Sequence, residues 1–107
     1  MAATVSVTAS ADLKNGERLI RGTATCSANY QSSTGEVMDL SSHLSGSPTV
    51  VLNGDDGYEA QHDRGTAAAG AIHLYEAGAD GAALDELGDA SNAAAVIVGF
   101  LAVGLPA

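Results

Sequence analysis

The longest uninterrupted apolar run in the chain, residues 93–104, places the strictest limit on its fold. The run reads Ala-Ala-Ala-Val-Ile-Val-Gly-Phe-Leu-Ala-Val-Gly, with β-branched residues in its middle. It is shorter than the roughly 20 residues that a membrane-spanning helix needs, and β-branched residues favour strands. We therefore interpret the run as a strand buried on both faces, which needs apolar surfaces above and beside it.

The preceding residues predict short strands at intervals of about ten residues, separated by turns rather than helices. Asn15-Gly16 is a strong hairpin signal, and residues 58–76 form a second hairpin. This pattern predicts an all-β fold, an antiparallel β-sandwich or jelly-roll-like domain spanning residues 1–107. The expected strands before the final run are residues 4–9, 18–27, 36–40, 49–52, 58–63 and 70–76.

The sequences of two segments are compatible with helical structure. Residues 41–44 predict a single helical turn that places Leu40 and Leu44 on one side and is closed by Gly46 and Pro48. Residues 77–92 fit either a short helix from Asp80 through Leu84 and Leu87 to Gly88, or a flexible loop. A longer helix over residues 66–95 is the less favoured alternative, because each of its glycines costs about 1 kcal/mol against alanine.

The core is expected to be thin. Although 46% of the residues are hydrophobic, alanine is the commonest residue, only 4% are aromatic and tryptophan is missing. A small domain of this kind gains stability from association with other chains. The residues expected to face inward are Ile20, Ala24, Cys26, Ile72, Leu74, Val96, Val98 and Phe100.

Thirteen acidic residues against four basic ones give a formal net charge of -9. Nucleic acid and anionic membranes are not expected as partners, because both attract clustered basic side chains. The excess acid fits either solubility through self-repulsion or adaptation to high salt in a halophilic host. The basic residues are scattered along the chain at Lys14, Arg18, Arg21 and Arg64.

No catalytic, cofactor or metal site is predicted, and we do not expect an enzyme. Gly-x-Ser-x-Gly and phosphate-binding loops are missing. His43 fits a surface position, while His62 and His73 lie on neighbouring strands but on conflicting faces, with no third ligand. Cys26 is alone, so we expect a small buried hydrophobe rather than a disulfide or thiolate zinc site.

The acidic loops allow a calcium site, although a solvated acidic surface explains the same residues and is favoured. The carboxylates concerned are Asp55, Asp56, Asp80, Asp85, Glu86 and Asp89. The first residues lack a basic segment followed by an apolar one, so no signal peptide is expected. We expect a protein that is made, and kept or assembled, in a cytoplasm.

Three features occur in a familiar order. Tyr30 precedes a polar, glycine-containing turn and the 36–40 strand, Gly57-Tyr58 opens the second hairpin with Asp63 near its turn, and the final strand ends in Ala-Val-Gly. In this order the chain resembles small β-rich capsid decoration (cement) proteins of tailed bacterial and archaeal viruses. It departs from them in its acidic, alanine-rich 77–92 segment.

The resemblance implies a jelly-roll-like domain, often trimeric, that clamps neighbouring major capsid subunits on the outside of an icosahedral shell and has no active site. The leading hypothesis is therefore a virion protein, assembled in the host cytoplasm, with the major capsid protein and its own copies as partners. A carbohydrate- or host-surface-binding head-fibre or tail module is the alternative. The expected oligomer or shell contacts are Ile97, Leu101 and Val103 on the second face of the final strand, with Thr4 and Val5 near the N-terminus.

Overall fold

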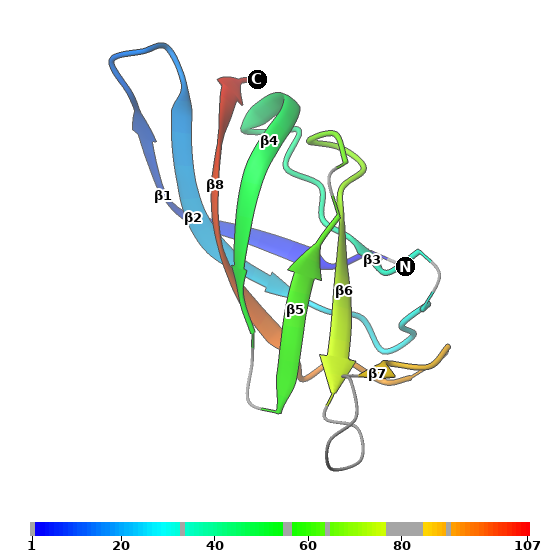
Figure 1. Cartoon of the computed structure of the whole chain (residues 1–107). Coiled ribbons are helices and arrows are strands. Elements are labelled where there is room, and N and C mark those ends of the chain that lie inside the picture. Colours follow the sequence, from blue (N-terminus) through cyan, green and yellow to red (C-terminus); the bar gives the residue numbers. More distant parts are fainter. Residues whose placement is uncertain (1, 33, 55–56, 64, 77–84, 90) are drawn as a thin grey trace.

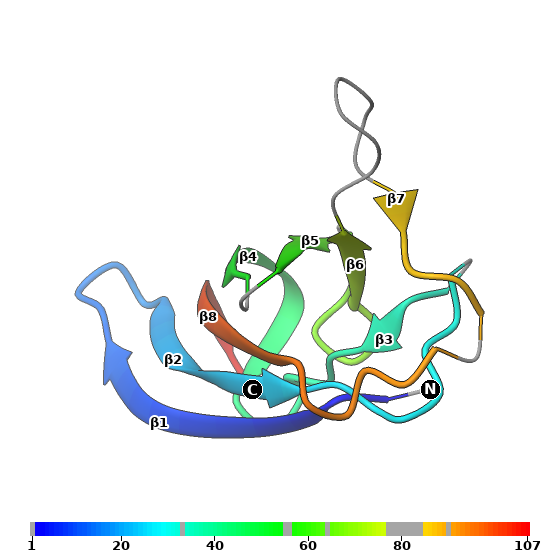
Figure 2. The ribbon, with the colours of Figure 1, turned by 90° about the horizontal axis from the view of Figure 1, so that it is seen from below.

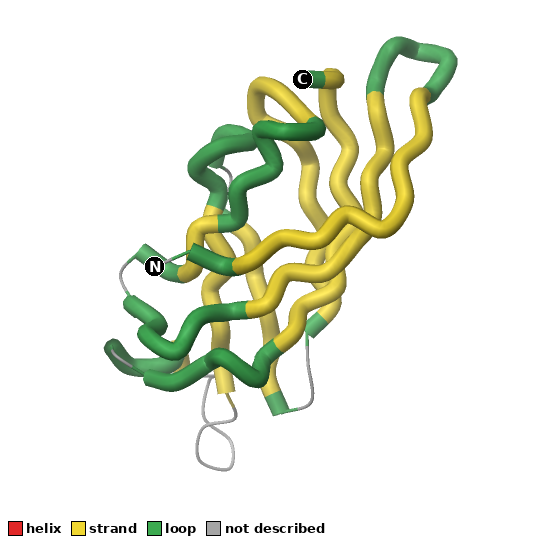
Figure 3. Tube along the Cα trace, turned by 180° about the vertical axis from the view of Figure 1, so that it is seen from behind, coloured by secondary structure: helices red, strands yellow, loops and turns green. Residues whose placement is uncertain are grey.

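Antiparallel strand pairs dominate the computed structural model, which describes residues 2–32, 34–54, 57–63, 65–76, 85–89 and 91–107. The described residues contain strands and loops but no helix, which confirms the all-β prediction (Figure 3). All pairings between the named strands are antiparallel. The strands are β1 (Thr4–Asp12), β2 (Arg18–Thr25), β3 (Glu36–Val37), β4 (Leu44–Asn53), β5 (Tyr58–His62), β6 (Ala71–Glu76), β7 (Asp85–Glu86) and β8 (Ile97–Pro106).

The strands form two sheets that pack face to face as a β-sandwich (Figures 1 and 2). The first sheet has the order β1-β2-β8-β4, so the last strand of the chain lies between β2 and β4. The second has the order β3-β6-β5, and β7 also pairs with β6. Alternation along each strand sends one set of side chains between the sheets and the other set outward.

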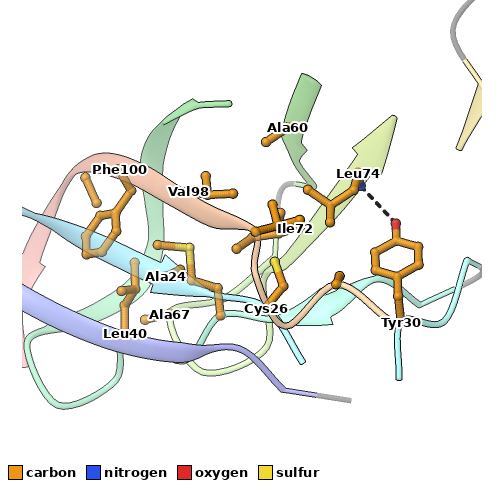
Figure 4. Close-up of a cluster of buried hydrophobic side chains, with 14 of the residues drawn as sticks. Ala24, Cys26, Tyr30, Leu40, Ala60, Ala67, Ile72, Leu74, Val98 and Phe100 are labelled. Atoms are coloured by element: carbon orange, nitrogen blue, oxygen red, sulfur yellow. Dashed lines mark hydrogen bonds between the residues drawn. The ribbon is translucent and has the colours of Figure 1, made fainter. Parts of the chain in front are cut away.

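One hydrophobic core fills the space between the sheets (Figure 4). Ile20 and Ala24 enter it from β2, Val98 and Phe100 from β8, and Leu74 from β6. These positions, together with buried Ile72, Cys26 and Val96, agree with the inward faces predicted from the alternation of apolar residues. Tyr30 is fully buried in the same core.

The first hairpin closes through the predicted Asn-Gly turn, in which Gly16 adopts a φ of 90°. A β-bulge interrupts the hairpin between Val7 and Ala9. At the bulge the backbones approach so closely that a Cβ on Gly22 would clash with the carbonyl oxygen of Ser6. Glycine at position 22 therefore permits the pairing of β1 with β2.

The single helical turn expected at residues 41–44 is present as one hydrogen-bonded turn that does not continue as a helix. Residues 41–43 form a hydrogen-bonded turn in which the Leu44 N–H donates to the Leu40 carbonyl over 2.9 Å, and Leu44 already begins β4. Leu40 and Leu44 are both buried, as expected. Gly46 and Pro48 do not end a helix but lie where the register of β4 against β8 shifts. Long-range pairing with β8 thus extends β4 by five residues before the expected Thr49 start.

The final run differs from the prediction in extent and exposure. Its strand, β8, begins at Ile97 and continues to Pro106, whereas the three alanines precede it. One face of β8 is buried and the other is open in this chain, so the strand is not buried on both faces. The helix considered for residues 80–88 lies partly outside the described residues, and its described part includes β7 instead. β6 also excludes the longer helix over residues 66–95.

Candidate functional site

The outward face of β8 exposes three large apolar side chains. Ile97, Leu101 and Leu105 are 50%, 41% and 59% exposed, and Val51 on the adjacent β4 is 60% exposed. The side chains on β8 are exposed because alternation along the strand directs them outward, while it buries Val98, Phe100 and Ala102 on the inner face. An apolar strip in the middle of an open sheet is a common feature of protein interaction sites.

Strand register extends this strip across the sheet. Leu101 lies between Arg21 on β2 and Val51 on β4, while Val103 lies between Leu19 and Thr49. We call the outward-facing residues of the four strands the acid-free face. By register they are Thr4, Ser6, Ala9, Ala11, Leu19, Arg21, Thr23, Thr25, Ser45, Thr49, Val51, Asn53, Ile97, Gly99, Leu101, Val103 and Leu105.

The acid-free face carries no carboxylate, although the chain has thirteen. Arg21 is its only charged residue, and no described carboxylate pairs with the guanidinium group. Shallow hollows lie on both sides of Arg21 and Leu101; one is lined by Ala9 and Ala11, the other by Val51 and Gly99. Depletion of charge around a central arginine is typical of the middle of protein interfaces.

The sheet brings four of the five predicted contact residues to one face. Ile97, Leu101, Val103 and Thr4 all belong to the acid-free face, with Val103 half-buried. Val5 lies on the opposite side of β1, where it is half-buried and packs against the core. The prediction missed Arg21 and Val51, because their proximity to Leu101 depends on which strands flank β8.

A polar cluster lies on the second sheet. Glu86 Oε2 accepts a 2.6 Å hydrogen bond from the Tyr30 hydroxyl and lies 2.9 Å from His73 Nδ1. His73 Nε2 lies 3.6 Å from Asp63 Oδ2. The Tyr30 hydroxyl also accepts the Leu74 N–H over 2.9 Å (Figure 4). Burial first, and then the hydrogen bond to Glu86, raises the pKa of Tyr30. The cluster joins a buried tyrosine to a surface histidine.

This cluster borders a solvent-facing depression rather than a closed cavity. His73 donates through Nδ1 to Glu86 when its ring is neutral, which leaves Nε2 as an acceptor near Asp63. Burial, the largest effect, lowers the pKa of the neighbouring His62. The depression is lined by Ser32, Gln61, His62, Asp63, His73, Tyr75 and Glu86.

The histidines and acidic residues do not form a recognisable metal site within the described part of the chain. His73 pairs with Gln61 and His62 with Ile72, which confirms that the two rings belong to opposite faces of the hairpin. Asp89 Oδ1 accepts two 2.8 Å hydrogen bonds from Ser32, and these lower its pKa. Asp55, Asp56 and Asp80 of the calcium hypothesis lie outside the described residues.

Cys26 and Glu36 are both buried, and the charge of Glu36 affects the Cys26 thiol. Burial first, and then the charge of Glu36, raises the pKa of the Cys26 thiol to about 12. Glu36 Oε1 accepts hydrogen bonds from the Ser27 N–H and hydroxyl at 2.6 and 2.7 Å. Its Oε2 is buried without a hydrogen-bond partner among the described residues. The expected buried cysteine is confirmed, whereas the buried glutamate was not predicted.

Comparison of the chain with protein-family models, with curated proteins and with solved structures found no match. No helix long and apolar enough to cross a bilayer occurs in the described segments. Function is therefore inferred from the two surfaces described above.

Proposed function

We propose that this protein is a structural protein of a virus particle, a capsid decoration protein that attaches to the outside of the shell through its acid-free face. The observation that carries the proposal is the exposed apolar strip of Val51, Leu101 and Leu105 beside Arg21, which no described carboxylate pairs. The resemblance noted in the sequence implies the kind of assembly. The major capsid protein is the partner, and several copies of the decoration protein attach to each shell. In the resembled family these copies are often trimers.

The acid-free face suits this role physically. Burying Leu101 and Val51 against a partner gains roughly 25 cal/mol per Å² of apolar surface. A carboxylate on the partner would pair with Arg21, which fixes orientation more than it adds affinity. Many copies on one shell, each with a modest contact area, would add their stabilising effects.

The proposal is tested on purified particles from cells that produce the protein. Leu101→Asp places a charge in the middle of the acid-free face and should strip the protein from particles and lower their resistance to heat. Leu13→Asp is the matched control, because Leu13 is also an exposed leucine but lies in the β1–β2 turn. Particles without the wild-type protein, or equal attachment of both variants, would contradict the proposal.

Saccharide binding is a second candidate, favoured by the depression on the second sheet. Tyr75 lines it together with Gln61 and Asp63, a combination of one aromatic ring with amide and carboxylate groups. Tyr30 cannot stack on a sugar because it is fully buried. Saturable binding on a glycan array that is lost in Tyr75→Ala would support this candidate, and an array without signal would remove it.

A further inference from the structure

The sequence contains two Asn-Gly pairs, Asn15-Gly16 in the β1–β2 turn and Asn53-Gly54 at the end of β4. In such a pair the backbone nitrogen of the glycine can attack the side-chain amide of the asparagine, because glycine has no side chain to hinder the approach. Asparagine belongs to the thermolabile residues. An acidic residue follows each pair, so a difference in reactivity between the two has to come mainly from the fold.

Hydrogen bonds restrain the first pair. The Asn15 side chain accepts the Glu17 N–H through Oδ1 over 3.0 Å and donates through Nδ2 to Glu17 Oε1 over 2.8 Å. The Gly16 N–H donates to the Leu13 carbonyl over 3.1 Å. Both the amide that would be attacked and the nitrogen that would attack it are therefore engaged, and these bonds have to break before the two groups can react.

The second pair has no such restraint. Asn53 is exposed on the acid-free face, and neither its side-chain amide nor the Gly54 N–H makes a hydrogen bond to any residue that the structure describes. A Cβ on Gly54 would clash with the Tyr58 carbonyl oxygen, so the fold requires glycine at the position that would attack. The exposed amide is also open to water, which the reaction consumes.

We propose that Asn53 is a modification site, which in the folded protein converts spontaneously to aspartate and isoaspartate while Asn15 is preserved. The Gly54 nitrogen forms a bond to Cγ of Asn53, the Cγ–Nδ2 bond breaks, and ammonia leaves with the proton of the Gly54 N–H. Water then opens the resulting cyclic imide. Opening at Cγ gives aspartate, and opening at the main-chain carbonyl gives isoaspartate, whose main chain runs through Cγ.

Both products change the acid-free face. They place a carboxylate in the hollow that Asn53 shares with Arg21 and Leu101. Isoaspartate also adds one atom to the main chain at the end of β4, where Asn53 pairs with Gly99. A new charge in this hollow would have to be buried against a partner, and it would repel a partner carboxylate that pairs with Arg21. Attachment should therefore weaken as the protein ages. This consequence rests on the proposed function, whereas the reaction itself does not.

Peptide mapping by mass spectrometry tests the reaction on the full chain, which is kept folded at neutral pH and body temperature for several weeks. The mass gain from amide to acid should appear at Asn53 about tenfold or more faster than at Asn15, because only Asn15 has to break hydrogen bonds first. Fragmentation locates each change, and isomerisation of an existing aspartate leaves the mass unaltered. Native Asn53 that stays intact, or that reacts no faster than Asn15, would overturn the proposal.

The same measurement in denaturant is the control for local sequence. Without the fold the two asparagines should react at similar rates, and a difference that persists in denaturant would overturn the proposal. Glu17→Ala removes the acceptor of Asn15 Nδ2 and should speed the native reaction of Asn15 about threefold or more, with Asn53 unaffected. Glu59→Ala is the matched control, since it removes an exposed acid from β5 and should change neither rate. An unchanged rate of Asn15 in Glu17→Ala would contradict its protection by these bonds.

Attachment to particles is measured separately. Asn53→Asp reproduces the aspartate product and should weaken attachment about fivefold or more, whereas Asn53→Gln keeps an amide and should attach as wild type. If Leu101→Asp fails to attach while Asn53→Asp attaches as wild type, the consequence for attachment is wrong and the proposed function stands. If the wild-type protein itself does not attach, the proposed function is wrong, and the mass measurements still decide the reaction of Asn53.

Discussion

The Tyr30 hydroxyl donates a 2.6 Å hydrogen bond to Oε2 of Glu86, which lies 56 residues further along the chain. The same hydroxyl accepts the Leu74 N–H, so one buried oxygen joins β6, β7 and the loop after β2. The pair also connects the core to the His73 side chain on the outer surface.

Tyr30→Phe removes this oxygen and leaves the buried Leu74 N–H without its acceptor. We expect a loss of about 1 to 3 kcal/mol in the free energy of unfolding, measured by urea denaturation. Tyr58→Phe is the control, because its hydroxyl makes no hydrogen bond to the described residues, and it should cost much less. Equal effects of the two variants would contradict the role assigned to Tyr30.

Val98→Asp and Leu101→Asp should separate stability from association, because these two residues lie on opposite faces of β8. Val98 is fully buried, so an unpaired carboxylate there should unfold the domain or cost several kcal/mol. Leu101→Asp should leave the unfolding free energy within about 0.5 kcal/mol of wild type. Circular dichroism melts distinguish the outcomes, and unfolding by both variants would mean that Leu101 belongs to the core.

Gly22→Ala should destabilise the first hairpin by about 1 to 3 kcal/mol, because its methyl group would meet the Ser6 carbonyl at the bulge. Gly99→Ala is a matched strand position where the nearest atom, Asn53 Cβ, is 3.7 Å from the added carbon. It should cost far less. Comparison of the two unfolding midpoints in urea tests the close approach directly.

His62 should make the protein less stable as the pH falls. Burial lowers its pKa in the folded state, so the unfolded chain binds more protons between that lowered pKa and about 6.5. The stability that His62 contributes therefore rises with pH through this window, and its titration has no effect on stability above or below the window. His62→Gln should flatten that part of the profile of unfolding free energy against pH.

Cys26 should be unreactive in the folded protein. Its pKa of about 12 keeps the thiol protonated at neutral pH, and its side chain is buried. A thiol-specific reagent should label the native chain orders of magnitude more slowly than the chain in denaturant. Rapid labelling of the native protein would show that the space around Cys26 and Glu36 opens to solvent.

Much of the fold could be predicted because strand alternation is a local signal. Ile72 and Leu74 in β6, and Val98 and Phe100 in β8, were placed on the core side from their spacing alone. The same alternation assigned Ile97, Leu101 and Val103 to the other face. Asn15-Gly16 also located the first hairpin, since turn chemistry depends on neighbouring residues.

The remaining features depend on contacts between distant segments, which leave no local pattern. β4 begins at Leu44 because it pairs with the end of β8, and that pairing overrides the turn signals at Gly46 and Pro48. Arg21 and Val51 join the candidate site only because β8 lies between β2 and β4. The hydrogen bond between Tyr30 and Glu86 was missed for the same reason.

The acidic residues are distributed unequally between the two sheets, and this gives the molecule an electric dipole. Five acidic residues lie on or beside the second sheet: Glu59, Asp63, Glu76, Asp85 and Glu86. The acid-free face carries a single charged residue, Arg21. Near a negatively charged surface this dipole orients the protein so that its acid-free face points toward that surface before any contact forms. Collisions at low salt would then be productive more often than chance orientation allows, and salt would remove this advantage within a distance of about 10 Å at 0.1 M.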